Sequence, residues 1–263
     1  MKSPSQLIHF LGTGHGNACG NRYHTAILVK TIAGYTLFDC GEPVCHLLKK
    51  NGIDFNSIER LVISHLHGDH VGGFHMLIQG MWLERRKRPL PIYLPEEGVV
   101  PLQEILKMGY LDESLIGFKI HWHILKVGVP IQGDNIEAIP YPSTHLDVLK
   151  QLLQKKLKKQ FQAFCFDVNL RKFHLGMSMD LGAPEDIAPL FSQPVDLLVC
   201  ELAHFEPEAL FSYLKGKPFK KLVLTHIAEE FYNIRPKILK MAEKYLGKNK
   251  VKFAEDDMKI TLG

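Results

Sequence analysis

The chain has 263 residues, a formal net charge of +4 and a hydrophobic fraction of 46%, which together describe an ordinary globule large enough to bury one sizeable core. No apolar run approaches the roughly 20 residues needed to cross a bilayer, so the sequence excludes a membrane-spanning protein. The opening segment, Met1–Gln6, lacks the apolar core of a signal peptide, and the sequence therefore favours the cytoplasm.

The cysteines argue against a disulfide-stapled secreted scaffold, because their number is odd and they are scattered mostly through predicted strands. We therefore expect reduced thiols in the core. They are Cys19, Cys40, Cys45, Cys165 and Cys200.

Two basic runs, Arg85–Arg88 and Lys155–Lys159, supply much of the positive charge. Each is expected to be a solvated face rather than a nucleic-acid track. The mild excess permits a phosphate-bearing substrate without requiring one.

The first predicted strand, residues 7–11, runs into Gly12-Thr13-Gly14, which looks like the start of a dinucleotide-binding fingerprint. That fingerprint requires a helix directly after the glycines. The next periodic segments, residues 25–29 and 35–38, are β-branched and strand-like instead. The sequence therefore predicts an antiparallel meander and excludes a dinucleotide site here.

A cluster of potential metal ligands follows the apolar strand that begins at Leu61. Two of them, His65 and His67, lie two positions apart, so their side chains point to the same side of an extended segment. Asp69 and His70 follow where Gly68, Gly72 and Gly73 permit a turn. Neutral imidazole and carboxylate suit zinc, with manganese or iron as alternatives.

The rest of the chain alternates further helices and strands without an internal repeat or a linker, which predicts one domain over residues 1–263. Two mainly antiparallel mixed sheets with helices outside give an α/β fold, the αββα four-layer sandwich. Helical spacing covers residues 43–50, 74–86, 99–108, 146–160, 187–191, 208–214 and 238–246. Strand patterns cover residues 91–94, 118–127, 135–139, 162–168, 171–179, 197–202, 221–226, 251–254 and 258–262, with a hairpin turn at 169–170.

Three of these later strands also end in a ligand-type side chain, namely His145, Asp180 and His226. Asp167 competes with Asp180, but Asp180 is preferred because it follows a strand end and precedes a small turn. His121 and His123 alternate along one strand without an Asp-His pair after them. They are expected to be exposed strand positions.

The H-x-H-x-D-H string after a hydrophobic strand resembles the signature of the metallo-β-lactamase superfamily. The segments Phe10–Gly14 and Ile63–His70 resemble, more narrowly, its ribonuclease Z and phosphodiesterase branch. This resemblance implies the αββα sandwich. It also implies that Asp39, in the segment Asp39-Cys-Gly, supports the metal-bearing loop from outside the ligand set.

By this resemblance, His65, His67 and His145 would hold one divalent ion, Asp69, His70 and His226 a second, and Asp180 would bridge the pair. Zinc is the expected metal. The implied function is hydrolysis of a phosphodiester by a metal-bridging hydroxide. A proton for the leaving group would come from His204 in the segment Glu201–His204, so the expected catalytic residues are Asp69, Glu201 and His204.

Two departures from ribonuclease Z leave the substrate open between RNA and a small phosphodiester such as a cyclic nucleotide. The chain lacks a His-Ser-Thr segment between Glu201 and His226. In place of a long RNA-gripping arm it has only a basic helix at residues 149–160 and a hairpin. Because members of the family are often dimers, a homodimer is a further expectation.

The sequence leaves two other functions as alternatives. One is a metal hydrolase of a thioester, lactone or lactam, or an iron redox member of the superfamily. The other is a non-catalytic metal-binding module.

Overall fold

The computed structural model describes residues 6–262. These fall into two compact units, a first unit that runs to Leu125 and takes in Asp256–Leu262, and a second unit of Lys126–Glu255. The single domain expected over residues 1–263 stays a prediction, and the argument from Met1–Gln6 falls almost entirely outside the described residues. Among residues 6–262, every helix is too short or too polar to cross a membrane.

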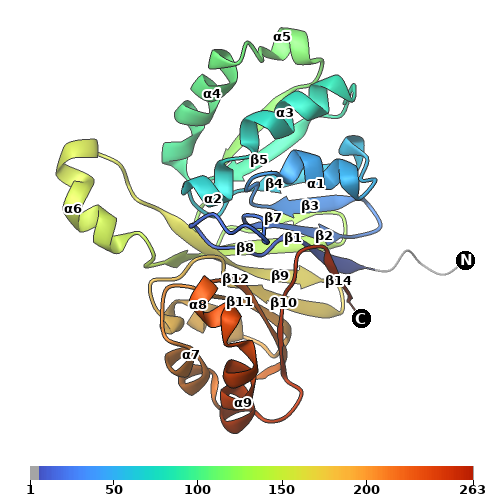
Figure 1. Cartoon of the computed structure of the whole chain (residues 1–263). Coiled ribbons are helices and arrows are strands. Elements are labelled where there is room, and N and C mark those ends of the chain that lie inside the picture. The colour runs from blue at the N-terminus through green and yellow to red at the C-terminus, as the bar shows by residue number, and fades with distance from the viewer. Residues whose placement is uncertain (1–5, 263) are drawn as a thin grey trace, which may run out of the picture. The chain divides into compact units, whose positions relative to one another are not determined.

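The first unit contains a seven-stranded sheet in the order β14-β1-β2-β3-β4-β5-β6 (Figure 1). The strands are β1 (Leu7–Gly12), β2 (Ala26–Lys30), β3 (Tyr35–Phe38), β4 (Ile58–Val62), β5 (Leu90–Leu94), β6 (Ile120–Ile124) and β14 (Met258–Thr261). The β1–β3 meander predicted from the sequence is present. From β3 to β6 the strands run parallel, because helices and loops connect them.

Helices cover one face of this sheet (Figure 1). They bury residues such as Leu47 and Leu77 against strand residues such as Leu61 and Ile92. The helices are α1 (Val44–Lys50), α2 (Gly68–Val71), α3 (Phe74–Leu83), α4 (Val99–Met108) and α5 (Glu113–Ile116), with short 3-10 turns η1 (Phe55–Ser57) and η2 (Glu96–Gly98).

The run Arg85–Arg88 is not the uniformly solvated face expected from its charge. Helix α3 ends at Leu83, and Arg85 adopts a left-handed φ of 56°. This turn directs Arg86 inward, where it is 1% exposed and donates hydrogen bonds to the carbonyl oxygens of Phe55, Arg88 and Pro89. Burial lowers the pKa of Arg86 to about 10.

The carboxyl-terminal strand holds the glycine-rich loop of the first unit. β14 pairs with β1, with Leu7 opposite Thr261. Just before β14, Asp256 accepts hydrogen bonds from the backbone N–H and the hydroxyl of Thr13, at 2.9 and 2.7 Å, and from the backbone N–H of Tyr23 at 2.8 Å. The loop after β1 is therefore fixed by residues from the far end of the sequence.

The second unit contains a seven-stranded sheet in the order β13-β12-β11-β10-β9-β8-β7. Its strands are β7 (Ile131–Gly133), β8 (Ile136–Ser143), β9 (Ala163–Leu170), β10 (Phe173–Met177), β11 (Val195–Leu202), β12 (Phe219–Ile227) and β13 (Val251–Phe253). Its helices are α6 (Asp147–Leu157), the 3-10 helix η3 (Pro184–Phe191), α7 (Pro207–Leu214), α8 (Glu229–Asn233) and α9 (Arg235–Leu246). Figure 1 shows α7 to α9 against one face of this sheet, whereas α6 projects from the unit.

Strand direction differs from the expectation of mainly antiparallel sheets. Among the described strands, each sheet has three antiparallel and three parallel pairings. In the second unit, η3 and helices α7 and α9 connect strands of one direction, which makes β10 to β13 parallel. The β9–β10 hairpin turns at Arg171–Lys172, not at Asn169–Leu170, because Leu170 still pairs with Phe173.

The cysteines agree with the expectation of free thiols. All five are free, and Cys40, Cys165 and Cys200 are buried. Burial raises the pKa of Cys165 to about 12, which keeps this thiol protonated and inert.

His174 on β10 is held between two hydrogen-bond acceptors inside the second sheet. Its Nε2 lies 2.5 Å from Oδ1 of Asp167 on β9, and its Nδ1 lies 2.9 Å from the carbonyl oxygen of Pro194. Desolvation lowers the pKa of His174, but these two acceptors, with the charges of Asp167 and Asp196, outweigh it, so the pKa is raised. Lys220 pairs with Asp196 beside it.

The pairing of His174 with Asp167 predicts that the free energy of unfolding depends on pH. The protonated form of His174 is favoured in the folded state, so its contribution is complete below the unfolded pKa of about 6.5 and is lost as the pH rises through the raised folded pKa. We expect the stability difference between the parent and His174→Gln to shrink between pH 6 and 9, by at most about 1.4 kcal/mol per pH unit. Urea unfolding across this range measures it. His46→Gln, at an exposed histidine, is the control, and a pH-independent difference for His174→Gln would contradict the assignment.

Candidate metal-binding residues

The turn after β4 brings the four ligand-type residues of the first unit together. The ring centroid of His65 lies 4.7 Å from that of His67 and 4.1 Å from that of His70. Oδ2 of Asp69 lies 3.3 Å from Nε2 of His70. His65 and His70 are fully buried, and Asp69 is 8% exposed. The cluster predicted from the sequence is therefore one compact group on α2 and the segment before it.

Asp39, directly after β3, orients the histidine turn that carries these four residues. It is fully buried and accepts hydrogen bonds from the backbone N–H of Ser64 at 2.7 Å and the Ser64 hydroxyl at 2.8 Å. Its Oδ2 also lies 2.6 Å from Nδ1 of His70. Because a carboxylate only accepts, Nδ1 of His70 carries the proton and Nε2 presents its lone pair for a ligand. The supporting role that the resemblance gives to Asp39 matches this geometry.

Two glycines allow the Asp39 turn and the histidine turn to approach this closely. The N–H of Cys40 donates to the carbonyl of His70 at 2.8 Å, and the N–H of Gly73 donates to the carbonyl of Cys40 at 2.9 Å. A Cβ at Gly41 would lie 2.2 Å from the carbonyl oxygen of Asp69, and one at Gly73 would lie 2.7 Å from that of Cys40. Any side chain at either position would push the two turns apart.

In the second unit, three imidazoles converge on one carboxylate. Oδ2 of Asp180 lies 3.2 Å from Nε2 of His226, 3.6 Å from Nε2 of His145 and 4.0 Å from Nε2 of His204. Asp180 and His226 are each 2% exposed. The residues predicted from three separate strand ends therefore meet. Asp167, the competing candidate, lies within β9 and pairs with His174.

Glu201, at the end of β11, fixes the position of His204. Its Oε1 lies 2.8 Å from Nδ1 of His204 and accepts the N–H of Leu181 at 2.9 Å. Its Oε2 accepts the N–H groups of Ala203 and His204. Glu201 is fully buried and accepts four hydrogen bonds, and the 34% exposed His204 side chain is the group that faces Asp180. The catalytic role expected for Glu201 stays a prediction.

Asp186 is a positioning residue that sequence reasoning missed. Its carboxylate accepts the N–H and hydroxyl of Thr144, at 2.9 and 3.0 Å, and the N–H of Gly182 at 2.9 Å. It thereby joins the loop that carries His145 to the turn after Asp180. Its place in the first turn of η3, two residues after Pro184, is typical of an acidic residue that caps a helix start. That sequence signal could have identified it.

Three residues at these sites adopt a left-handed φ that non-glycine residues rarely take. They are Asp39 at 57°, Met179 at 47° and His226 at 46°. Asp39 and Met179 follow the ends of β3 and β10, whereas His226 lies inside β12 at a register shift against β11, so the strain redirects the chain at or beside the ligand-type and supporting side chains. Such strain is retained only where the surrounding structure fixes it.

The chemistry of these side chains suits divalent metal ions. The structure brings together His65, His67, Asp69 and His70 within the first unit. Within the second it brings together His145, Asp180, His204 and His226. Imidazole nitrogens with carboxylate oxygens are the ligand set of zinc and related ions, and buried acids orient two of these imidazoles, those of His70 and His204.

Comparisons with known proteins give a family and a set of relatives. A family model described as "Anti-Pycsar protein Apyc1" matches residues 6–167. The ribonuclease Z of Methanothermobacter thermautotrophicus is 36% identical over 139 residues, which cover 52% of this chain and 44% of that protein. The chain thus spans about half the length of the curated relatives it matches.

Two solved structures share the fold across almost the whole chain. The metallo-β-lactamase fold protein YhfI from Bacillus subtilis aligns with a TM-score of 0.78 at 16% identity, covering 99% of this chain and 100% of that one. Human tRNase Z, short form, aligns with a TM-score of 0.73 at 20% identity, covering 98% and 99%. The predicted α/β sandwich class is confirmed.

Proposed function

Because this chain belongs to the family described as Anti-Pycsar protein Apyc1, within the ribonuclease Z-like branch of the metallo-β-lactamase superfamily, we propose that it is a metal-dependent phosphodiesterase. The observation that carries the proposal is the convergence of His145, His204 and His226 on Asp180, each at the end of a different segment. The buried Asp39–His70 pair in the other unit supports it.

The metal ligands are assigned as the resemblance implies. His65, His67 and His145 would hold one ion, and Asp69, His70 and His226 would hold the second. Asp180 would be shared by the two ions, a role supported by its place among imidazoles and its low exposure. Zinc is the proposed metal because imidazole and carboxylate are its usual ligands, with manganese and iron as the alternatives.

Divalent ions held by these residues would act as Lewis acids on the phosphoryl oxygens and activate water at neutral pH. The chain supplies the proton for the leaving oxygen. Glu201 holds Nδ1–H of His204, so any second proton of the imidazole is on Nε2, on the side of Asp180. Nε2–H can then be donated to a leaving alkoxide, and Glu201 stabilises the imidazolium beforehand.

The proposed substrate is a phosphodiester, either in RNA or in a small nucleotide. Partial exposure of the His204 side chain, 34%, leaves the acid accessible to such a substrate. The expected homodimer stays a prediction.

The test is a phosphodiester assay with metal titration, comparing the parent with His204→Ala. We expect the chelated parent to be inactive, and zinc or manganese to restore cleavage of bis-nitrophenyl phosphate but not of a lactone or thioester. Because nitrophenolate leaves without a proton, His204→Ala should lose much less activity on it than on an alkyl phosphodiester, where a loss of about a hundredfold is expected.

His46→Ala, at an exposed histidine, is the matched control for this assay. If the metal-loaded parent cleaves none of the phosphodiesters, the proposed function is wrong. If His204→Ala loses equal activity on both leaving groups, His204 is not the acid.

A further inference from the structure

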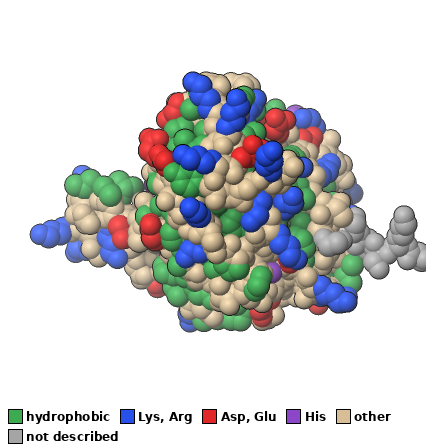
Figure 2. All heavy atoms as spheres, turned by 90° about the horizontal axis from the view of Figure 1, so that it is seen from below, with side chains coloured by type: hydrophobic (Ala, Val, Ile, Leu, Met, Phe, Trp, Pro, Cys, Tyr) green, Lys and Arg blue, Asp and Glu red, His purple; other side chains and the backbone are tan. Residues whose placement is uncertain are grey.

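Helix α6 projects from the second unit and leaves part of its apolar surface without a partner in that unit. None of its residues is buried, and its outward face carries Val148 and Leu152, which are 66% and 72% exposed. Figure 2 shows apolar and basic side chains together on this projecting part. A surface helix normally turns its apolar stripe to the protein and its polar stripe to water.

One polar side of α6 borders a pocket of about 610 Å³ between the helix and the sheet of its own unit. Asp147, Lys150, Gln154 and Lys158 line this pocket, and their spacing of three, four and four residues defines one side of a helix. The opposite wall is the paired end of β8 and β9, where Ser143 is opposite Ala163 and Pro142 is opposite Phe164. The volume is in the range of small-molecule sites, which is about 300–1,000 Å³.

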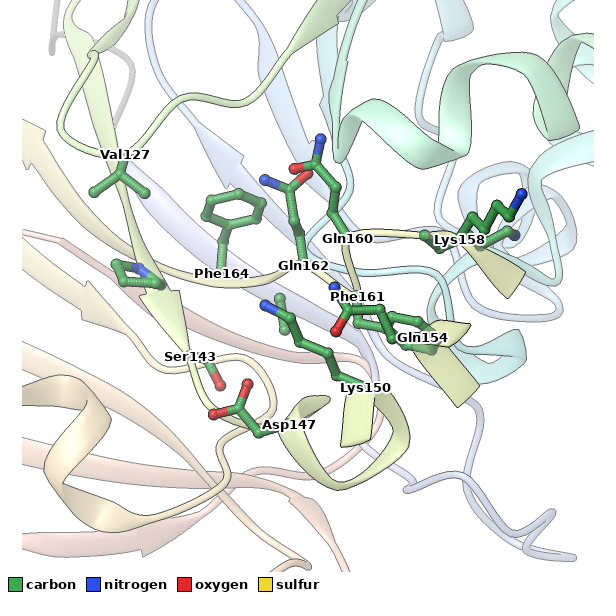
Figure 3. A pocket seen from close by; sticks show the side chains of 13 residues that line it. Val127, Ser143, Asp147, Lys150, Gln154, Lys158, Gln160, Phe161, Gln162 and Phe164 are labelled. Carbon is green, nitrogen blue, oxygen red and sulfur yellow. The ribbon is translucent and has the colours of Figure 1, made fainter. Parts of the chain in front are cut away.

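The lining combines the groups that bind the parts of a nucleotide. The side chain of Lys150 has no hydrogen bond or ion pair among residues 6–262, and Figure 3 shows it directed into the pocket. An ammonium group of this kind binds phosphate as a point charge. The half-buried ring of Phe161 offers an apolar surface for a base, and the amide of Gln154 can both donate and accept along a base edge.

The pocket also lies next to two of the assigned metal ligands, Asp180 and His145. Ser143, in its wall, donates a hydrogen bond from its hydroxyl to the carbonyl of Asp180 at 2.6 Å and accepts one from the N–H of His145 at 3.2 Å. A ligand in the pocket therefore lies beside the loop that carries two of the assigned metal ligands. A nucleotide bound here would place its phosphate within reach of that loop.

We propose that the pocket under α6 binds one nucleoside phosphate unit of the substrate, with Lys150 on its phosphate. This inference rests on the proposed phosphodiesterase function for the identity of its ligand. It assigns substrate binding to residues that are not metal ligands. The unit is either a free mononucleotide or one nucleotide of an RNA strand.

The test measures binding of adenosine monophosphate, adenosine and a short oligouridylate to the metal-free protein by calorimetry, in the parent, Lys150→Ala and Lys156→Ala. Lys156 is the matched control, because it lies on the same helix, is exposed, and is on the side opposite to the pocket. Both substitutions remove one positive charge, so any diffuse electrostatic effect on binding is the same. Circular dichroism establishes that both variants keep their fold.

We expect Lys150→Ala to weaken binding of adenosine monophosphate or of oligouridylate by about ten- to a hundredfold, with little effect from Lys156→Ala. Which of the two ligands shows the dependence on Lys150 identifies the source of the nucleotide unit. Adenosine should bind more weakly than its monophosphate in the parent and be insensitive to Lys150. Equal loss in both variants, or no loss in either, would overturn the proposal.

The two proposals can fail separately. Binding is measured without metal and without turnover, so a Lys150-dependent site would stand even if no phosphodiester were cleaved. Conversely, cleavage with binding that ignores Lys150 would refute the pocket alone.

Discussion

Replacing Asp180 with asparagine is expected to lower phosphodiester turnover by about a thousandfold and to reduce the bound metal. The substitution keeps the shape of the side chain and removes its charge. Three imidazole nitrogens lie within 4.0 Å of Oδ2 of Asp180, at 2% exposure, so no other acid can take over this position from solvent. Turnover of metal-reconstituted protein and metal content by mass spectrometry measure the effect.

Asp167→Asn is the matched control, because Asp167 was the other candidate for the bridging position. Its carboxylate pairs with His174, so this variant should keep its metal and its turnover and lose stability instead. An Asp180→Asn protein with parental activity would refute the ligand assignment. So would an Asp167→Asn protein that had lost its metal but remained folded.

Replacing Asp39 with alanine is expected to cost about 3–5 kcal/mol of unfolding free energy, because one partner of a buried pair is removed. Ser64 and His70 would together leave three donor groups without their acceptor in a site of zero exposure. Urea unfolding of the metal-free protein measures this loss without the contribution of bound metal.

Asp39→Asn separates stability from metal binding. The amide retains an acceptor for Ser64 but no negative charge for Nδ1–H of His70, so His70 loses the group that fixes its tautomer. We expect a smaller loss of stability than in Asp39→Ala, with metal affinity lowered by about 10–100-fold. If Asp39→Ala unfolded at the same urea concentration as the parent, the support that we assign to Asp39 would be wrong.

The parts of this molecule that were predictable from sequence are those with a local signal. The apolar run before His65 and the helical spacing in α3 mark their elements directly, and the strand ends at His145, Asp180 and His226 mark where side chains can meet. The direction of the strands was harder to predict, because periodicity carries no information on whether neighbouring strands run parallel. It depends on the connections, and short helices such as α7 decide it.

The residues that support the site and the core could not be predicted from the sequence in the same way. Asp186, His174 and Arg86 act through partners distant in the sequence, such as Thr144, Asp167 and Phe55. A charge run such as Arg85–Arg88 predicts solvation on average, and one left-handed residue was enough to turn Arg86 into the interior. These outcomes depend on tertiary contacts, to which composition is insensitive.

The pairing of β14 with β1 bears on the order in which a ribosome can complete this protein. Residues of the H-x-H-x-D-H turn emerge early, yet the loop beside them, at Gly16, is fixed only when Asp256 and β14 have been made. Until then β1, with its buried apolar side chains, is an open sheet edge that another nascent chain could occupy. The loop beside the first ligands to be synthesised is thus among the last parts to be secured, and premature termination would release an aggregation-prone chain.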